Sequence, residues 1–190
     1  IVWDLDGTLI ASHLLPGCEE KYPAAKYPKF FAHIDDDFHF TDGTPNTRTW
    51  FRPYAKIVIR VLNIFTVQHV FTAAQQTYTD NIMEKLDPQK KLFKTILHRN
   101  CFEEKYISKN GKDVLFVVKD EDILKRTILF DDRQRNFKQR PENGYLVPEY
   151  TEVDSNDLEM LQFFKVILRC HFAKDVRHIL CSFVGKNKAV

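Results

Sequence analysis

The opening stretch Ile1-Val2-Trp3-Asp4-Leu5-Asp6-Gly7-Thr8 decides the expected fold. Its three apolar residues predict a short buried strand, and two carboxylates follow where that strand would end. Two carboxylates so close together repel one another unless a cation compensates them. Magnesium prefers oxygen ligands and completes its shell with water and substrate phosphate. The stretch therefore predicts a strand with a magnesium site at its carboxyl end.

The same stretch has two other interpretations. Asp6 and Gly7 favour a turn whose acids are simply solvated. A calcium loop begins with similar spacing but requires a further ligand, typically Glu, at a fixed later position. The residues after Thr8 are Leu-Ile-Ala-Ser-His, which excludes the calcium interpretation.

Length and composition indicate one globular domain spanning residues 1–190. Hydrophobic residues make up 44% and charged residues 28% of the chain, and the net charge is +2. Such a small charge excludes strong attraction of the whole surface to nucleic acid. Four cysteines without a CxxC pair predict reduced thiols, and neither a membrane span nor a signal peptide is visible. Because the chain begins three residues before Asp4, we expect further sequence upstream.

Apolar runs alternate with helical patterns along most of the chain. Strands are expected at 1–3, 67–71, 127–130 and 145–147, and helices at 53–65, 75–86 and 155–182. In the last helix Leu158, Leu161, Phe164 and Leu168 share one side. Residues 11–48 predict loops and short hairpin strands, and 105–119 predict a hairpin that turns at Asn110-Gly111. This alternation is typical of an α/β fold with a mostly parallel sheet covered by helices on both faces.

Polar residues follow three further strands in the order hydroxyl, lysine, acid pair: Thr72, Lys119 and Asp131-Asp132. Singly, each has a structural explanation as a helix cap or an edge lysine. Ligands of parallel sheets bind beyond the carboxyl ends of the strands, where these side chains would meet Asp4. The sequence therefore predicts a phosphoryl-transfer site in which a carboxylate attacks phosphorus.

The order of these residues resembles the haloacid-dehalogenase-like superfamily, and more closely its FCP/SCP branch, the NLI-interacting-factor-like phosphatases of the RNA polymerase II C-terminal domain. Four stretches carry the resemblance: Asp4 to Leu9; Arg52-Pro53; Phe71-Thr72-Ala73-Ala74 with Tyr78 and Asp80; and Val118-Lys119-Asp120 leading to Asp131-Asp132-Arg133. The run from Arg135 to Gly144 looks most like the ubiquitin-like-domain-containing member. The resemblance implies a Rossmannoid fold with a small β-hairpin insertion and no large cap domain.

The resemblance also implies a role for each site residue. Asp4 would be the nucleophile and a Mg²⁺ ligand, and Asp6 the acid/base and a ligand through its carbonyl. Thr72 and Lys119 would bind phosphate, assisted by Thr8, which steadies the catalytic loop. Asp132 would ligate Mg²⁺ with support from Asp131.

Two features depart from the branch or stay open. Gly7 stands where this branch more often has Glu. The basic residue that contacts substrate in the insertion is either His98 or Arg99, because the local alignment slides by one residue.

The expected activity is magnesium-dependent hydrolysis of phosphoserine or phosphothreonine through an aspartyl-phosphate, on peptides like the RNA polymerase II C-terminal domain. One alternative is a polynucleotide 3′-phosphatase, which DLDGTLI also resembles and the Phe-Thr-Ala-Ala stretch disfavours. Another is a catalytically silent peptide-binding module like a mitochondrial import receptor subunit, a branch that tends to lose the acid pair. We expect an intracellular monomer, nuclear or cytoplasmic with the nucleus favoured, without membrane or nucleic-acid partners.

Overall fold

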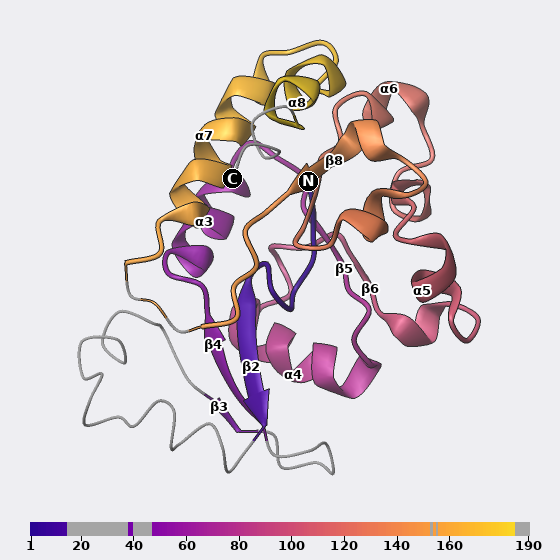
Figure 1. The fold of residues 1–190 in the computed structure, drawn as a ribbon. Helices are drawn as coiled ribbons and strands as arrows, with labels where there is room; N and C mark the ends of the chain where they lie inside the picture. Colours follow the sequence, from indigo (N-terminus) through magenta and orange to yellow (C-terminus); the bar gives the residue numbers. More distant parts are fainter. Residues whose placement is uncertain (15–37, 40–46, 153, 155, 185–190) are drawn as a thin grey trace.

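The computed structural model describes residues 1–14, 38–39, 47–152, 154 and 156–184. Its centre is a five-stranded parallel sheet in the order β6-β5-β1-β7-β8 (Figure 1). The strands are β1 (Val2–Trp3), β5 (His69–Phe71), β6 (Thr95–Leu97), β7 (Leu129–Asp131) and β8 (Gly144–Leu146). The expected α/β class is confirmed, and β1 in the middle places Asp4 at the centre of the carboxyl edge.

Alternating side chains of the central strands feed two separate apolar layers. Trp3 points into the larger layer, where its ring stacks on Phe130 at 4.7 Å between centroids. Val2 points the other way, into a smaller layer with Phe71 and Leu129. Because successive side chains of a strand face opposite sides, a two-residue strand can anchor both layers.

Helices cover both faces of this sheet (Figure 1). The larger layer is closed by α3 (Ala55–Leu62), α4 (Gln76–Leu86), α7 (Glu159–His171) and α8 (Arg177–Val184). The smaller layer is closed by α5 (Tyr106–Asn110), α6 (Glu121–Leu124) and the 3₁₀ turns η2 (Val114–Phe116) and η3 (Gln134–Phe137). Two further 3₁₀ turns are η1 (Arg99–Cys101) and η4 (Pro141–Asn143).

A small antiparallel sheet lies beside the carboxyl edge, in the order β2-β4-β3. Its strands are β2 (Ile10–Leu14), β3 (Phe38–His39) and β4 (Thr47–Phe51). These strands confirm the short hairpin strands expected within 11–48, the rest of which lies outside the described residues. The small antiparallel hairpin therefore lies between β1 and α3, whereas the segment around His98 and Arg99, where the insertion is expected, forms β6 and η1.

The hairpin expected over residues 105–119 is wrong. This segment forms α5 and η2, and the Gly111 amide closes the last helical turn by donating to the Ile107 carbonyl. The Asp113 carboxylate accepts a hydrogen bond from the Leu115 amide at 3.0 Å, which favours a tight turn over an extended chain. Gly111, at φ +77°, ends the helix and does not serve a strand reversal.

The helical pattern expected over 155–182 is interrupted, and of its predicted apolar stripe only Leu161 and Phe164 pack, partly buried, against the core. The helix α7 ends at His171, and α8 begins at Arg177. The core side of α7 carries Met160, Phe163, Val166, Ile167 and Cys170. Leu158 and Leu168 remain 49% and 38% exposed, respectively. The helix carries two apolar stripes, and the neighbouring sheet decides which one is buried.

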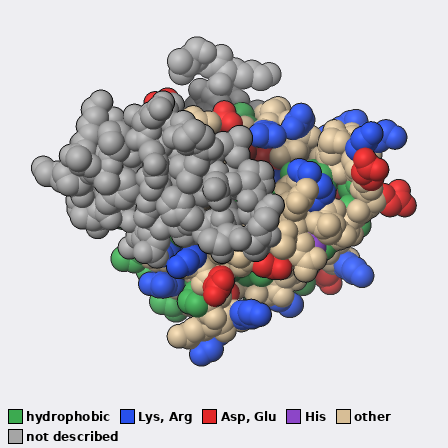
Figure 2. Space-filling model, turned by 90° about the horizontal axis from the view of Figure 1, so that it is seen from below, with side chains coloured by type: hydrophobic (Ala, Val, Ile, Leu, Met, Phe, Trp, Pro, Cys, Tyr) green, Lys and Arg blue, Asp and Glu red, His purple; other side chains and the backbone are tan. Residues whose placement is uncertain are grey.

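The composition also predicts reduced thiols and no membrane span. Cys101, Cys170 and Cys181 carry free thiols, whereas Cys18 lies outside the described residues. Among the residues placed by the structure, no helix is long and apolar enough to cross a membrane. On the face seen in Figure 2, Lys and Arg side chains are interspersed with Asp and Glu, so this face carries mixed charge.

Candidate active site

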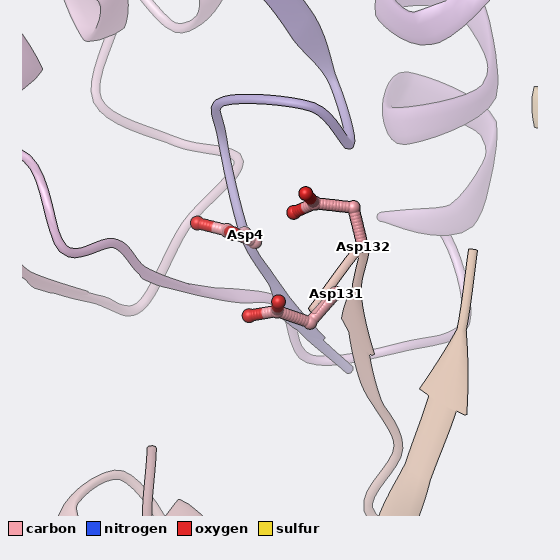
Figure 3. Close-up of side chains that lie close together, drawn as sticks. All are labelled: Asp4, Asp131 and Asp132. Atoms are coloured by element: carbon pink, nitrogen blue, oxygen red, sulfur yellow. The ribbon is translucent and has the colours of Figure 1, made fainter. Parts of the chain in front are cut away.

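Three carboxylates meet at the carboxyl edge of the central sheet. Asp4 follows β1, Asp131 ends β7 and Asp132 comes next in the chain. One oxygen from each lies within 4.8 Å of the others, and the three side chains face a common space (Figure 3). β1 and β7 are neighbours in parallel register, with Trp3 opposite Phe130. The sheet therefore brings together acids that lie more than a hundred residues apart in the sequence.

The lysine that reaches these carboxylates is Lys112. Its Nζ lies 2.7 Å from Asp4 Oδ1 and 2.6 Å from Asp131 Oδ2, and the side chain is fully buried. Burial alone would lower the pKa of Lys112, but the attraction of Asp4 and Asp131 outweighs it and raises the pKa above its usual value. Lys112 is therefore held as a cation between the two acids.

The structure does not bring the predicted lysine, Lys119, to this site. Lys119 lines a different cavity, together with Ile1 and Val67, which precede β1 and β5 at the amino edge of the sheet. The prediction required the run Val114–Val118 to be a strand that ends at the site. Because this run begins as the turn η2, Lys119 lies at the opposite edge.

Between Thr72 and Asp131 the sequence contains two Lys-Asp pairs, Lys112-Asp113 and Lys119-Asp120. Only the second follows an uninterrupted apolar run, which made it the better match to a strand end. The signal that could have identified the first is Gly111, which turns the chain so that the next side chain points inward. Gly111 has φ +77°, and the Lys112 amide donates to the Asn136 carbonyl at 2.8 Å.

Asp131 is saturated with hydrogen bonds. Asn136 Nδ2 donates to both of its oxygens at 2.8 and 2.9 Å, and the Arg133 amide donates at 2.9 Å. With Lys112, these donors hold the carboxylate in one orientation. Asp131 therefore positions Lys112, and Asn136, which the sequence did not single out, positions Asp131.

Asp132 has the opposite character. Its Oδ1 is buried and has no hydrogen-bond partner among the described residues, and Arg133 approaches only Oδ2, at 3.5 Å. Burial, then repulsion from Asp131, raises the pKa of Asp132. Burial likewise raises the pKa of Asp4 well above its usual value, although Lys112 opposes the shift. A divalent cation bound here would favour the ionised form of these acids and would coordinate the unpartnered oxygen of Asp132. The residues therefore fit Mg²⁺.

Gly7 gives this cluster its room. Its φ is +77°, and an added Cβ would lie 2.7 Å from the carboxyl carbon of Asp132. The catalytic loop therefore passes Asp132 more closely than any other residue type permits. The Asp132 side chain occupies the space that a Glu side chain at this position would need, which explains why Gly stands here.

Asp6 lines the cleft beside Asp4 and is held by Tyr78. The Tyr78 hydroxyl donates to Asp6 Oδ1 at 2.6 Å. Burial raises the pKa of Asp6, and the hydrogen bond from Tyr78 opposes the shift. A carboxyl group that keeps its proton more readily than usual is suited to general acid catalysis.

Thr72 lies at the end of β5 in the same cleft, as predicted from its strand. Its hydroxyl oxygen accepts a hydrogen bond from the Ala74 amide at 3.1 Å, which leaves its hydroxyl proton to donate elsewhere. Thr8 is fully buried next to the acid pair, and its hydroxyl oxygen has no partner among the described residues.

The cleft has a volume of about 570 Å³ and extends past Thr72 to residues of η1 and α5. Three arginines line it: Arg99, Arg133 and Arg135. Of the two basic candidates in the insertion, Arg99 lies in the cleft and donates from Nε to the Ala73 carbonyl at 2.8 Å. The His98 ring lies instead near the Cys101 sulfur, at 3.6 Å.

Comparison with known proteins agrees with this geometry. Residues 1–177 match the family model of NLI interacting factor-like phosphatases. The chain belongs to this family. This family is the branch predicted from the sequence, so that prediction is confirmed. The closer likeness to the ubiquitin-like-domain-containing member stays a prediction.

Several curated proteins are similar to this chain in sequence. A CTD small phosphatase-like protein 2 from Dictyostelium discoideum is 27% identical over 96% of this chain, and a CTD nuclear envelope phosphatase 1B from Danio rerio is 25% identical over 99%. A mitochondrial import inner membrane translocase subunit TIM50 from Kluyveromyces lactis is 29% identical over 72%. The aligned regions cover 29%, 73% and 28% of these relatives, respectively. The chain thus corresponds to less than a third of two of them.

The fold is shared with Fcp1, described as an essential RNA polymerase II CTD phosphatase. Its structure superposes with a TM-score of 0.75 over 94% of this chain and 68% of that one, at 16% identity. A fission yeast Fcp1-R271A structure bound to beryllium fluoride superposes with a TM-score of 0.64 over 95% of this chain and 52% of that one, at 17% identity. These likenesses establish the haloacid-dehalogenase-like fold that the sequence predicted.

Proposed function

We propose that this chain is a magnesium-dependent protein phosphatase that hydrolyses phosphoserine or phosphothreonine through an aspartyl-phosphate on Asp4. The observation that carries the proposal is the contact between Lys112 and Asp4, next to the unpartnered oxygen of Asp132, in a cleft that Asp6 also lines. This arrangement supplies a nucleophile, positive charge, a cation site and an acid within one space.

The geometry of Asp4 separates its two oxygens. Oδ1 accepts hydrogen bonds from the Lys112 ammonium and from the Leu5 amide at 2.8 Å. Oδ2 is then the atom that attacks phosphorus, so that an Oδ2–P bond forms while the bond from phosphorus to the serine or threonine oxygen breaks. Asp6 gives its proton to that departing oxygen. In the second step Asp6 takes a proton from water, whose oxygen attacks phosphorus and releases Asp4.

Charge in the transferring phosphoryl group is offset by residues at the base of the cleft. Lys112 places a cation beside Asp4, and Thr72 in the same cleft can donate a hydroxyl proton to a phosphoryl oxygen. When bound by Asp4 and Asp132, with the Asp6 carbonyl as a further ligand, Mg²⁺ would supply additional positive charge to the phosphate oxygens. Thr8 would steady the loop, and Asp131 would act through Lys112.

An open cleft favours a peptide substrate over a small metabolite. Residues 72–119, which include α4, η1 and α5, build no separate cap over the cleft. The three arginines along the cleft suit an anionic chain segment, because guanidinium groups recognise phosphate through paired hydrogen bonds. Together with the names of the relatives, these features favour phosphorylated peptides like the RNA polymerase II C-terminal domain.

Two alternatives remain distinguishable by experiment. The TIM50 relatives favour a peptide-binding module without catalysis. Against it, Asp4, Asp6 and Asp132 are all present, and Lys112 binds Asp4 as a catalytic lysine would. The polynucleotide 3′-phosphatase alternative retains the same chemistry and changes only the substrate.

Compartment and assembly belong to the same proposal. The free thiols of the described cysteines fit a reducing, intracellular location. Relatives are named for the nuclear envelope and for the mitochondrial inner membrane, and we favour the nucleus because the acid pair is retained. We propose a monomer that acts without a membrane or nucleic-acid partner.

The test is phosphate release from three substrates, each with and without Mg²⁺: a phosphoserine heptad peptide, p-nitrophenyl phosphate and a 3′-phosphorylated oligonucleotide. We expect Mg²⁺-dependent turnover of the first two and loss of both in Asp4→Asn. Faster turnover of the oligonucleotide would favour the polynucleotide phosphatase. No turnover of any ester would favour the binding module.

A further inference from the structure

Three hydroxyl groups form a continuous chain that ends on Asp6. Tyr78 OH lies 2.6 Å from Asp6 Oδ1, Ser12 Oγ lies 2.6 Å from Tyr78 OH, and Thr49 Oγ1 lies 2.6 Å from Ser12 Oγ. The four residues come from the catalytic loop, α4, β2 and β4. These hydrogen bonds therefore link Asp6 to the small antiparallel sheet.

The direction of this chain follows from counting protons. Each hydroxyl group has one proton to donate. Tyr78 gives its proton to Asp6, so Ser12 donates in its bond with Tyr78. Thr49 bonds both Ser12 and Tyr78, and because neither has a proton left for it, Thr49 donates as well. Every hydroxyl thus points its proton toward Asp6. Hydrogen bonds aligned in one direction polarise and strengthen one another, so Tyr78 is held as a donor.

We propose that Tyr78 is a positioning residue for the acid step, one that holds Asp6 Oδ1 so that the catalytic proton is carried on Oδ2. An oxygen that accepts the Tyr78 proton cannot also present a proton along that line. When Asp6 acts as an acid, its proton is therefore on the other oxygen and leaves from there to the serine or threonine oxygen of the substrate. This inference rests on the proposed function.

Removing the hydroxyl should slow only those reactions that need the acid. An alkoxide is a poor leaving group and requires a proton as the bond to phosphorus breaks, whereas p-nitrophenolate leaves as a stable anion. kcat/KM reports the steps up to formation of the aspartyl-phosphate, so it excludes the later role of Asp6 with water. The comparison of two leaving groups through kcat/KM therefore isolates acid catalysis.

In Tyr78→Phe we expect kcat/KM for a phosphoserine peptide to fall about 10-fold or more, because a positioned acid contributes about 10²–10⁴-fold. For p-nitrophenyl phosphate we expect a change within about twofold, because that leaving group needs no proton. Equal losses on both substrates would overturn the inference, because a merely structural hydroxyl would affect both.

The matched control is Tyr145→Phe. Tyr145 is a partly buried tyrosine on β8 that packs against Phe130, Phe163 and Phe183, away from the cleft. Its variant removes one hydroxyl without touching the chain that ends on Asp6. We expect the ratio of the two kcat/KM values to stay at its wild-type value.

A second variant tests the order of the chain. Ser12→Ala should lower kcat/KM for the phosphoserine peptide in the same direction as Tyr78→Phe, and should have no further effect when Tyr78 is already Phe. Additive losses in the double variant would mean that Ser12 and Tyr78 act separately, and would overturn the inferred order of hydrogen bonds. A wild-type chain without Mg²⁺-dependent phosphatase activity would overturn the proposed function and this inference with it, whereas active wild type with equal losses would overturn the inference alone.

Discussion

The ammonium of Lys112 lies buried between two carboxylates that both need it. Asp4 and Asp131 each contact Nζ at less than 3 Å, and neither is exposed by more than a few per cent. Removing one member of such a buried group leaves uncompensated charge, which costs far more than losing an exposed pair. Lys112 therefore stabilises the fold and, in the proposed mechanism, also stabilises the transferring phosphoryl group.

Lys112→Met should lower the free energy of unfolding by about 3 kcal/mol, the lower end for breaking a buried ion pair, and should abolish phosphatase activity. Urea denaturation and phosphate release measure the two effects. The matched control is Lys119→Met at the opposite edge of the sheet, for which we expect wild-type activity. Loss of activity in Lys119→Met with retention in Lys112→Met would contradict the assignment of Lys112 and favour Lys119, the lysine predicted from the sequence.

Gly7→Ala tests the close passage of the catalytic loop past Asp132. A Cβ at φ +77° is strained and would lie 2.7 Å from the Asp132 carboxyl carbon. We expect the free energy of unfolding to fall by about 1–2 kcal/mol, and Mg²⁺ to be required at higher concentration because Asp132 is displaced. A titration of activity against Mg²⁺ measures the second effect, and an unchanged half-saturating concentration would contradict it.

At this scale the sequence predicts the acids well and the lysine poorly. Asp4 follows the apolar strand β1 and Asp131 is the last residue of β7, so their place at the sheet edge can be predicted from the alternation of apolar runs with helices. Lys112 follows a short helix and a left-handed glycine, where no regular pattern marks the direction of the side chain. Asn136 acts within a 3₁₀ turn and is equally hard to predict.

Single residues can also join whole elements. Arg52, between β4 and α3, is almost fully buried and pairs with Asp157 at 3.0 Å ahead of α7. It donates to the Thr8 carbonyl at 3.1 Å and the Pro148 carbonyl at 3.0 Å. One guanidinium thus ties the catalytic loop to the segment that joins β8 to α7. The sequence marks Arg52 only through family resemblance, because its partners are distant in the chain.

Arg52→Met should lower the free energy of unfolding by about 3–5 kcal/mol, because Asp157 loses its buried partner. Activity should fall as the loop that carries Asp4 loosens. Chemical denaturation measures the first effect, with Lys125→Met as the control. Lys125 pairs with Asp122 on the exposed surface, where we expect no measurable loss. Equal stability of the two variants would contradict the role of Arg52.

Elements with regular periodicity are predictable here, whereas short turns are not. The helices α3 and α4 and the strands β5 and β7 begin and end within about three residues of their expected positions. The segment 105–119 differs because local hydrogen bonds from Asp113 and a helix-ending glycine outweigh strand propensity. The buried face of α7 depends on the sheet it packs against, which no local pattern contains.

For the whole molecule, the carboxylate cluster predicts that Mg²⁺ stabilises the fold. A ligand that binds only the folded state at 100 times its dissociation constant adds about 2.7 kcal/mol. We therefore expect the melting temperature to rise with Mg²⁺ and to return to its starting value with a chelator. In Asp132→Asn the rise should be much smaller. An equal rise in both chains would contradict the assignment of Asp132.

Acid stability should depend on His69, which is buried on β5. Burial lowers its pKa to about 4. Between about pH 6.5, the usual histidine value, and pH 4, the unfolded chain binds a proton that the folded chain refuses. The contribution of His69 is therefore fully present above pH 6.5 and is lost as the pH falls toward 4. Urea midpoints measured without metal should fall more steeply in wild type than in His69→Gln, and parallel curves would contradict this.

Attack of the Asp4 carboxylate on phosphorus is the central step of the proposed mechanism. The direct measurement is an acid quench during turnover of a ³²P-labelled phosphoserine peptide, followed by mapping of the protein-bound label. We expect a hydroxylamine-sensitive label on Asp4 that forms with Mg²⁺ and is missing in Asp4→Asn. Turnover with the label on another residue, or undiminished turnover in Asp4→Asn, would contradict it.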